Sequence, residues 1–181
     1  LPPSIGQLGA LKQLTIRSLD KLEEMPDTFG SLTSLKRLTI DNCPELKTVP
    51  ASMGALEELT LERLDKLEEM PDTLDRLTRL EISELHVLKE IPDPSGLTRL
   101  ESLLIACCSE LKMIPQLEAL RELMVTCLPK LEEMPDILGG MTSLESLTIH
   151  DCRALKTLPP SIPQLGALKQ LTILSLDKLE E

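Results

Sequence analysis

Leucine and isoleucine recur along the whole chain in one fixed pattern. Residues 35–50 read L-x-x-L-x-I-x-x-C-x-x-L-x-x-V-P, where most of the x positions are polar. The first leucine of this pattern returns at steps of 20 to 24 residues, at Leu11, Leu35, Leu56, Leu77, Leu100, Leu120, Leu144 and Leu168. A period of this size predicts a solenoid, in which each unit packs only against its neighbours.

The spacing within each unit predicts one short strand. Leu38 and Ile40 flank the polar Thr39, and this alternation indicates a strand with one buried face. Stacked units would set the strands side by side in a parallel sheet, about 4.8 Å apart. Because the pattern and its period match the leucine-rich repeat, the predicted fold class is an α/β repeat solenoid. We expect a horseshoe with a concave parallel β-sheet and short 3₁₀ or α turns on its convex side.

The repeats divide the chain into eight coils that form a single domain over residues 1–181. The coils, numbered 1 to 8, are residues 1–24, 25–48, 49–69, 70–90, 91–113, 114–133, 134–157 and 158–181. The coils that begin at Val49, Met70 and Ile114 are three or four residues shorter on the convex side. We therefore expect helical turns in the long coils and tighter loops in the short ones.

Charges in the loop after the strand alternate in sign from coil to coil. Glu23 is followed by Lys47 at the same repeat position, and Glu132 by Lys156. Such pairs are exposed, and each contributes about 0.2 to 1 kcal/mol. This alternation predicts ion pairs that help to fix the register between neighbouring coils.

The two outermost coils are nearly identical. Residues 1–24 return as residues 158–181, with Gly6 replaced by Pro163 and Arg17 by Leu174. Neither coil shows the polar outer face that solenoids need at their ends for solubility. Two interpretations are open: the chain is part of a longer array, which we favour, or copies associate through uncapped ends into head-to-tail fibres.

Charge and composition narrow the choice of partners. The formal net charge is −11, which disfavours a nucleic acid or an anionic membrane surface and favours a protein partner with a basic face. No apolar run reaches the roughly 18 residues of a membrane span. The five cysteines are odd in number and follow the repeat pattern, so a reducing compartment, the cytoplasm, is expected.

The outward-facing positions of the predicted sheet indicate a candidate binding site. The middle outward position is mostly threonine, but it is Leu104 in coil 5 and Met124 in coil 6. With Ala106 and Thr126 these residues make the one apolar island predicted on that face. The charged residues expected around the island are Arg79, Arg121, Glu81 and Glu122. An exposed apolar patch with a charged rim is typical of a protein-binding site, and ordinary drift between repeats is the alternative.

No pattern of catalytic or cofactor-binding residues is present. His150, Asp151 and Cys152 are consecutive, but adjacent strand residues point to opposite faces and do not converge as a nucleophile and its base. The sequence holds no C-x-x-C metal pattern and no phosphate-binding glycine loop. Cys107 and Cys127 share one repeat position in adjacent coils, where we favour free thiols over a disulfide. We therefore predict a protein that is not an enzyme and binds no metal or cofactor.

The cysteine-containing coils carry a resemblance to a known family. Residues 43–50 and 152–159 both read C-x-x-L-x-x-(hydrophobic)-P, and further leucines follow at repeat spacing. This phrase resembles the C-terminal leucine-rich repeats of plant intracellular immune receptors of the nucleotide-binding class. The resemblance implies a cytoplasmic recognition domain that binds a pathogen or host protein and restrains an attached switch module.

Two functions from different classes remain open. The first is a non-catalytic protein-recognition module that binds a protein ligand on its concave face. The second is a structural, self-assembling repeat array that forms head-to-tail fibres. Diversified concave residues favour the first, and the near-identical outermost coils favour the second.

Overall fold

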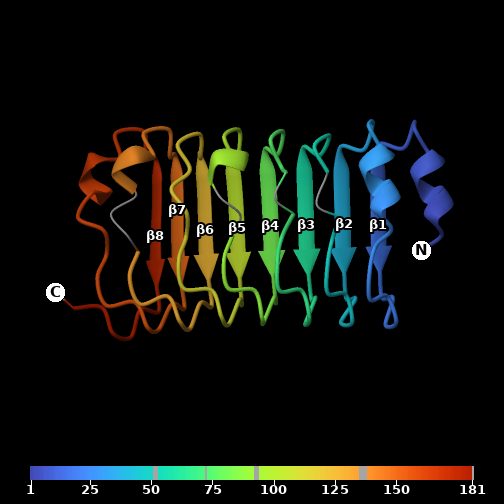
Figure 1. Cartoon of the computed structure of the whole chain (residues 1–181). Coiled ribbons are helices and arrows are strands. Elements are labelled where there is room, and N and C mark those ends of the chain that lie inside the picture. The colour runs from blue at the N-terminus through green and yellow to red at the C-terminus, as the bar shows by residue number, and fades with distance from the viewer. Residues whose placement is uncertain (51–52, 72, 92–93, 135–137, 181) are drawn as a thin grey trace.

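The chain folds into one parallel sheet of eight strands that follow each other in sequence order (Figure 1). The computed structural model describes the whole chain except residues 51–52, 72, 92–93, 135–137 and 181. The strands are β1 Gln13–Arg17, β2 Arg37–Asp41, β3 Glu58–Glu62, β4 Arg79–Ser83, β5 Ser102–Ala106, β6 Glu122–Thr126, β7 Ser146–His150 and β8 Gln170–Leu174. The sheet confirms the predicted leucine-rich-repeat solenoid. One strand lies in each predicted coil, and we keep the coil numbers as names.

Register in the sheet follows the repeat position by position. Leu38 of β2 pairs with Leu59 of β3, and Ile40 pairs with Leu61. The second and fourth residues of each inner strand point into the solenoid and are buried, whereas the first, third and fifth residues face outward. Because every coil contributes its leucines at the same height, the buried side chains form one continuous core.

Convex 3₁₀ turns occur where the coils are long. They are η1 Pro3–Gln7, η2 Asp27–Ser31, η3 Pro94–Gly96, η4 Leu138–Gly140 and η5 Ile162–Gln164. Proline precedes η1 and η2 as the N-cap residue, where its missing N–H leaves no helical bond unmade. The described parts of coils 3, 4 and 6 contain no 3₁₀ turn. Within the described residues, this confirms the predicted alternation of turns and tighter loops.

Each strand is followed directly by a residue with left-handed backbone geometry, a feature that the repeat pattern did not predict. All eight such residues have φ between 52° and 55°, and they are Ser18, Asn42, Arg63, Glu84, Cys107, Cys127, Asp151 and Ser175. The N–H of Ser18 donates to the carbonyl of Asp41 in the next coil at 3.0 Å, and this bond recurs along the sheet as far as Asp151. Ordinary L-residues thus adopt a conformation that favours glycine or asparagine, and in seven of the eight coils the same residue bonds to the next coil.

The second residue after each strand, which follows the left-handed residue, returns to the core. Three of the eight residues at this position are cysteines, and the Cys43 thiol donates to the carbonyl of Asp41 at 3.6 Å. Cys108 and Cys152 make the same bond to the carbonyl two residues earlier. Burial raises the pKa of the Cys108 and Cys152 thiols. In these three turns the thiol thus bonds to a backbone carbonyl.

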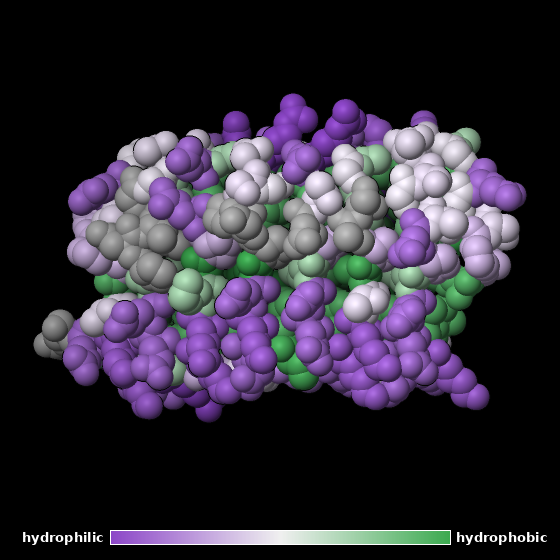
Figure 2. All heavy atoms as spheres, viewed as in Figure 1, coloured by the Kyte–Doolittle hydropathy of each residue, from purple (hydrophilic) through white to green (hydrophobic). Residues whose placement is uncertain are grey.

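The loops after the strands hold the predicted ion pairs. Lys47 Nζ lies 2.8 Å from Glu23 Oε2, and Lys156 Nζ lies 2.8 Å from Glu132 Oε2. Charged residues one position before the loop leucine pair in the same way: Lys66 pairs with Glu45, and Lys130 pairs with Glu110. Figure 2 shows the resulting hydrophilic lower edge beneath a band of hydrophobic residues. The hydrogen bond from Lys47 is the main reason that the pKa of Glu23 is lowered.

Candidate protein-binding surface

Strands β4, β5 and β6 bring most of the predicted binding residues onto one face. Their outward positions form three rows: Arg79, Ser102 and Glu122 in the first; Glu81, Leu104 and Met124 in the second; and Ser83, Ala106 and Thr126 in the third. Of the predicted residues only Arg121 lies outside this grid, directly before β6. The predicted residues are therefore neighbours in space, although they span about 50 residues of sequence.

The apolar centre of the grid is accessible. Leu104 and Met124 are paired in register, and Met124 is 40% exposed while Leu104 is half-buried. Glu81 lies beside Leu104 in the same row, and Thr148 of β7 lies on the other side of Met124. A small apolar surface with a charged neighbour on one side and a threonine on the other is thus presented outward.

Charged residues around the centre are partly paired. Arg79 Nη1 lies 3.6 Å from Glu81 Oε1, and the Ser102 hydroxyl donates to Glu122 Oε2 at 3.3 Å. Arg121 Nη1 lies 3.4 Å from Glu145 Oε1. A hydrogen bond from Lys169, assisted by the charge of Arg121, lowers the pKa of Glu145. These exposed pairs orient the charges, and each contributes little to stability.

The prediction of a single apolar island on the sheet was incomplete. Leu174 occupies the last outward position of β8 and is 52% exposed. Its equivalents in the other strands are polar or small, from Arg17 in β1 to His150 in β7. Comparison of this repeat column from coil to coil would have identified Leu174 from sequence alone.

Thiols and polar groups form a chain below the apolar island. The Thr126 hydroxyl lies 3.4 Å from His150 Nδ1, and the Cys127 thiol donates to Asp151 Oδ2 at 3.4 Å. The pKa of the Cys107 thiol is raised to about 11, mainly by burial and secondly by a hydrogen bond with Cys127. Both cysteines are free, and a thiol with so high a pKa is a poor nucleophile at neutral pH.

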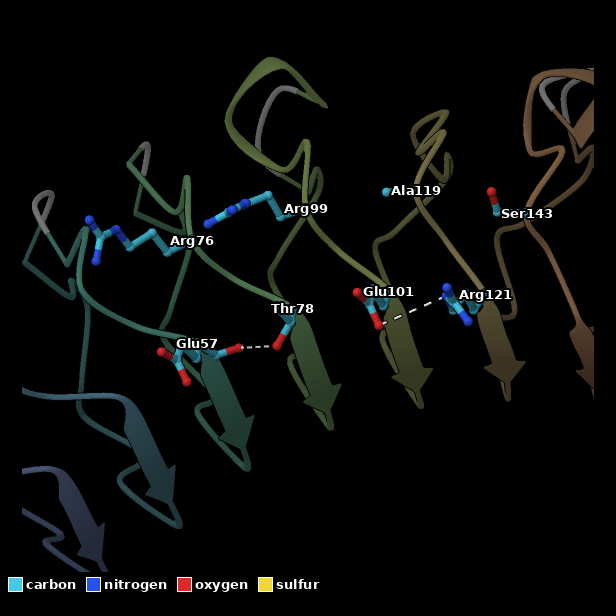
Figure 3. Close-up of a pocket in the computed structure, with 8 residues that line it drawn as sticks. All are labelled: Glu57, Arg76, Thr78, Arg99, Glu101, Ala119, Arg121 and Ser143. Carbon is cyan, nitrogen blue, oxygen red and sulfur yellow. Dashed lines mark hydrogen bonds and ion pairs between the residues drawn. The ribbon is translucent and has the colours of Figure 1, made fainter.

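A hollow lies at the amino-terminal edge of β3 to β7, and the sequence analysis did not find it. Its volume is 540 Å³, and its lining residues are Glu57, Arg76, Thr78, Arg99, Glu101, Ala119, Arg121 and Ser143 (Figure 3). Figure 3 shows Arg76 and Arg99 above the strands, with side chains that extend in the same direction. A second hollow of 270 Å³ shares Thr78, Glu101 and Arg121 with the first and continues onto the sheet.

One repeat column explains why the hollow forms. This column is the residue directly before the first leucine of the L-x-x-L pattern, such as Leu11 or Leu35. Its members are Ala10, Ser34, Ala55, Arg76, Arg99, Ala119, Ser143 and Ala167. Two long arginines thus stand beside small residues in coils 6 and 7, and the difference in side-chain length leaves open space. This break in an otherwise small-residue column was the available sequence signal.

Among the residues that the structure describes, no three His, Cys, Asp or Glu side chains lie together as a metal site would require. Within the same described part of the chain, no helix has the length and apolar character needed to span a bilayer.

Comparison with known proteins agrees with this architecture. Residues 48–180 match the family described as "Plant disease resistance protein RPS2-like, leucine-rich repeats". An 84-residue part of the chain is 32% identical to the Arabidopsis thaliana protein SUPPRESSOR OF npr1-1, CONSTITUTIVE 1. That match covers 46% of this chain and 6% of the relative's length.

Solved structures share the fold. The leucine-rich-repeat domain of the type III effector XopL superimposes over 98% of this chain and 73% of its own, with a TM-score of 0.72 and 27% identity. A leucine-rich-repeat protein of Leptospira interrogans matches 96% of this chain and 63% of its own, with a TM-score of 0.51 and 22% identity.

Proposed function

Because the chain belongs to the leucine-rich repeats of RPS2-like plant disease resistance proteins, we propose that it is a non-catalytic recognition module that binds a protein ligand on its concave sheet. The observation that carries the proposal is the break in the middle outward row. Threonine occupies this row in β1 to β3, β7 and β8, whereas Leu104 and Met124 occupy it in β5 and β6. Leucine-rich repeats use such extended concave surfaces for protein binding.

The charges around the island support a protein ligand with a basic face. The chain carries a formal charge of −11, and Glu81 and Glu122 border the apolar residues. In this arrangement the apolar centre supplies affinity, the charged rim orients the partner, and the net negative charge of the chain steers a basic partner toward it. Within this proposal the module works in the cytoplasm as the sensing part of a longer immune receptor.

A substitution that places charge in the island tests the proposal. The L104E/M124E variant and the unchanged protein are used as baits for plant leaf extract, and retained proteins are quantified by mass spectrometry. Each protein whose retention falls is then purified and its affinity measured by calorimetry. We expect at least one direct ligand whose affinity falls about 100-fold with L104E/M124E, because two buried charges would replace two apolar contacts.

The matched control adds the same charge elsewhere in the same row. Thr15 of β1 and Thr39 of β2 are paired in register as Leu104 and Met124 are, one of them exposed and the other half-buried, and T15E/T39E also adds two negative charges. Its ligand affinity should stay within about threefold of the unchanged protein. Equal losses in both variants, or no ligand that depends on Leu104 and Met124, would contradict this site.

A second candidate function, a structural array that grows head to tail, rests on a different observation. Several leucines of the two outermost coils are exposed, and they are Leu1, Leu8, Leu19, Leu171, Leu174 and Leu179. Light scattering on a sizing column over a wide concentration range tests this function. Growth into fibres would support an array, whereas a constant mass near 20.1 kDa would leave recognition as the function.

A further inference from the structure

We propose that the hollow at the amino-terminal edge of the sheet binds an acidic peptide segment, whose carboxylates pair with Arg76 and Arg99. This inference goes beyond the proposed function, because the hollow needs neither Leu104 nor Met124. The two arginines make the site locally positive, although the net charge of the chain is negative. The name arginine hollow is used below for the 540 Å³ space and its lining residues.

The two arginines hold positive charge that the surrounding residues do not neutralise. Among the residues that the structure describes, neither Arg76 nor Arg99 makes an ion pair or a hydrogen bond, and both are exposed. The glutamates that share the hollow pair with cations other than Arg76 and Arg99. Glu57 Oε1 lies 2.7 Å from Lys36 Nζ, and Glu101 Oε2 lies 4.0 Å from Arg121 Nε.

Like charges on adjacent coils depart from the pattern of the rest of the molecule. Elsewhere the charged columns mostly pair opposite signs, as in Glu23 with Lys47. Arg76 and Arg99 occupy the same repeat position in consecutive coils, and both side chains extend in one direction (Figure 3). Like charges at the same position of adjacent coils repel each other. A bound anion removes this repulsion, and the pair is therefore suited to hold one.

The shape and charge of the hollow select a peptide carboxylate. A guanidinium presents a planar fork of N–H donors that matches a carboxylate bidentately. Ala119 and Ser143 leave room for a main chain beside the two arginines. Glu57 and Glu101 line the same space, so a nucleic acid or another long polyanion would meet repulsion within a few ångströms of the arginines. A short acidic segment places its charges at the arginines alone.

Binding of a defined peptide tests this site directly. The probe is a fluorescein-labelled octapeptide of alternating glutamate and serine, titrated with the full chain at low ionic strength and followed by fluorescence anisotropy. R76A/R99A, which restores the small residue of this repeat column, should weaken binding about tenfold or more. The peptide with glutamine in place of glutamate should lose binding to the same extent.

A matched variant removes the same charge from the same edge of the sheet. Lys12 and Arg37 are exposed residues at the beginning of β1 and β2, and neither lines the arginine hollow. K12A/R37A should bind the peptide within about twofold of the unchanged protein, because a non-specific field effect would be small and screened. Circular dichroism and thermal melts establish that each variant is folded.

Several outcomes separate this site from its alternatives. Equal affinity of R76A/R99A and the unchanged protein would overturn the proposal. Inorganic phosphate that displaces the peptide with equal or higher affinity would also overturn it, in favour of a phosphate site. The neutral variant L104T/M124T should leave peptide binding unchanged, so failure of the proposed function at the apolar island and failure of this site are distinguishable.

Discussion

Coils 1 and 8 have nearly the same sequence, but they bury different residues. Leu8 of coil 1 is 52% exposed, whereas its equivalent Leu165 in coil 8 is 6% exposed. The reverse holds in the loop, where Leu22 of coil 1 is 8% exposed and Leu179 of coil 8 is 38% exposed. Since the residues are identical, their burial is decided by the neighbouring coil. Leu165 is covered from the side of coil 7, and Leu22 from the side of coil 2.

The two positions at which the coils differ both touch coil 2 in the structure. A Cβ atom on Gly6 would lie 2.5 Å from the carbonyl oxygen of Thr28 in η2. Arg17 Nε lies 2.7 Å from Asp41 Oδ2 in β2. Coil 8 has Pro163 and Leu174 at these positions. The changes thus fall where a coil recognises the coil that follows it.

This comparison bears on the head-to-tail alternative. If a coil like coil 2 were stacked on coil 8, its equivalent of Thr28 would meet the Pro163 ring in place of Gly6. Its equivalent of Asp41 would face Leu174 in place of Arg17. If coil 1 of another copy followed coil 8 instead, Glu180 would face Glu23, as the repeat columns show. Both arrangements are less favourable than the contact between coils 1 and 2. Either contact at coil 8 would therefore differ from the contact that joins coils 1 and 2.

The largest effect is expected when one leucine is truncated to alanine in coil 1 and, separately, in coil 8. Leu165→Ala should lower the free energy of unfolding by about 2–4 kcal/mol, because it opens a cavity against coil 7. Leu8→Ala, the same change at the equivalent residue, should cost less than about 1 kcal/mol, since half of that side chain is already in water. Urea denaturation followed by circular dichroism measures both. Equal losses would mean that coil 1 is stabilised by contacts outside the coil-to-coil interface.

A smaller effect is expected when a methyl group is added at the interface between coils 1 and 2. Gly6→Ala would place a Cβ 2.5 Å from the Thr28 carbonyl oxygen and 2.7 Å from the Thr28 Cβ. The backbone of η2 would have to move, and the bond from the Thr28 hydroxyl to the Pro3 carbonyl, now 2.8 Å, would stretch. We expect a loss of about 1–3 kcal/mol in thermal or urea unfolding.

The control for this change lies three residues further on. A Cβ on Gly9 would meet no atom within 4 Å, and its φ is not in the left-handed range. Gly9→Ala should therefore leave stability unchanged or raise it by a few tenths of a kcal/mol. A Gly6→Ala variant as stable as Gly9→Ala would show that η2 adapts freely, and the difference between coils 1 and 8 would lose its steric meaning.

The sheet and the convex turns could be predicted from sequence because they depend on residues within one coil. Alternation such as Leu38, Thr39 and Ile40 encodes a strand, and the length of a coil determines whether a 3₁₀ turn forms. The left-handed residues could not be predicted in this way. Arg63 and Glu84 have φ of 52° and 54°, although their side chains give no local preference for it. The geometry accompanies the turn after the strand and places the N–H of each residue on a carbonyl of the next coil.

The candidate site shows the same division. The island at Leu104 and Met124 could be predicted because it needs only the repeat column and the two-residue period of a strand. The arginine hollow depends on the difference in side-chain length between Arg99 of coil 5 and Ala119 of coil 6. Its charge depends on which of the nearby carboxylates are already paired. Such properties belong to the stack of coils and are not visible in any one repeat.

The smallest expected effect concerns the ion pair that distinguishes coil 1 from coil 8. Asp41 is a carboxylate whose side chain is only 3% exposed, held by Arg17 at 2.7 Å and by Arg63 at 2.5 Å. Arg17→Leu copies the residue of coil 8 and should cost about 1–2 kcal/mol, because one buried oxygen loses a charged donor while Arg63 still holds the other. The reciprocal change Leu174→Arg adds an arginine on β8, an edge strand of the sheet, where no strand among the described residues supplies an aspartate, and should alter stability by less than about 0.5 kcal/mol. Urea denaturation of both variants measures the asymmetry. If Arg17→Leu were as neutral as Leu174→Arg, Arg63 alone would suffice for Asp41, and Arg17 would not contribute to the recognition of coil 2 by coil 1.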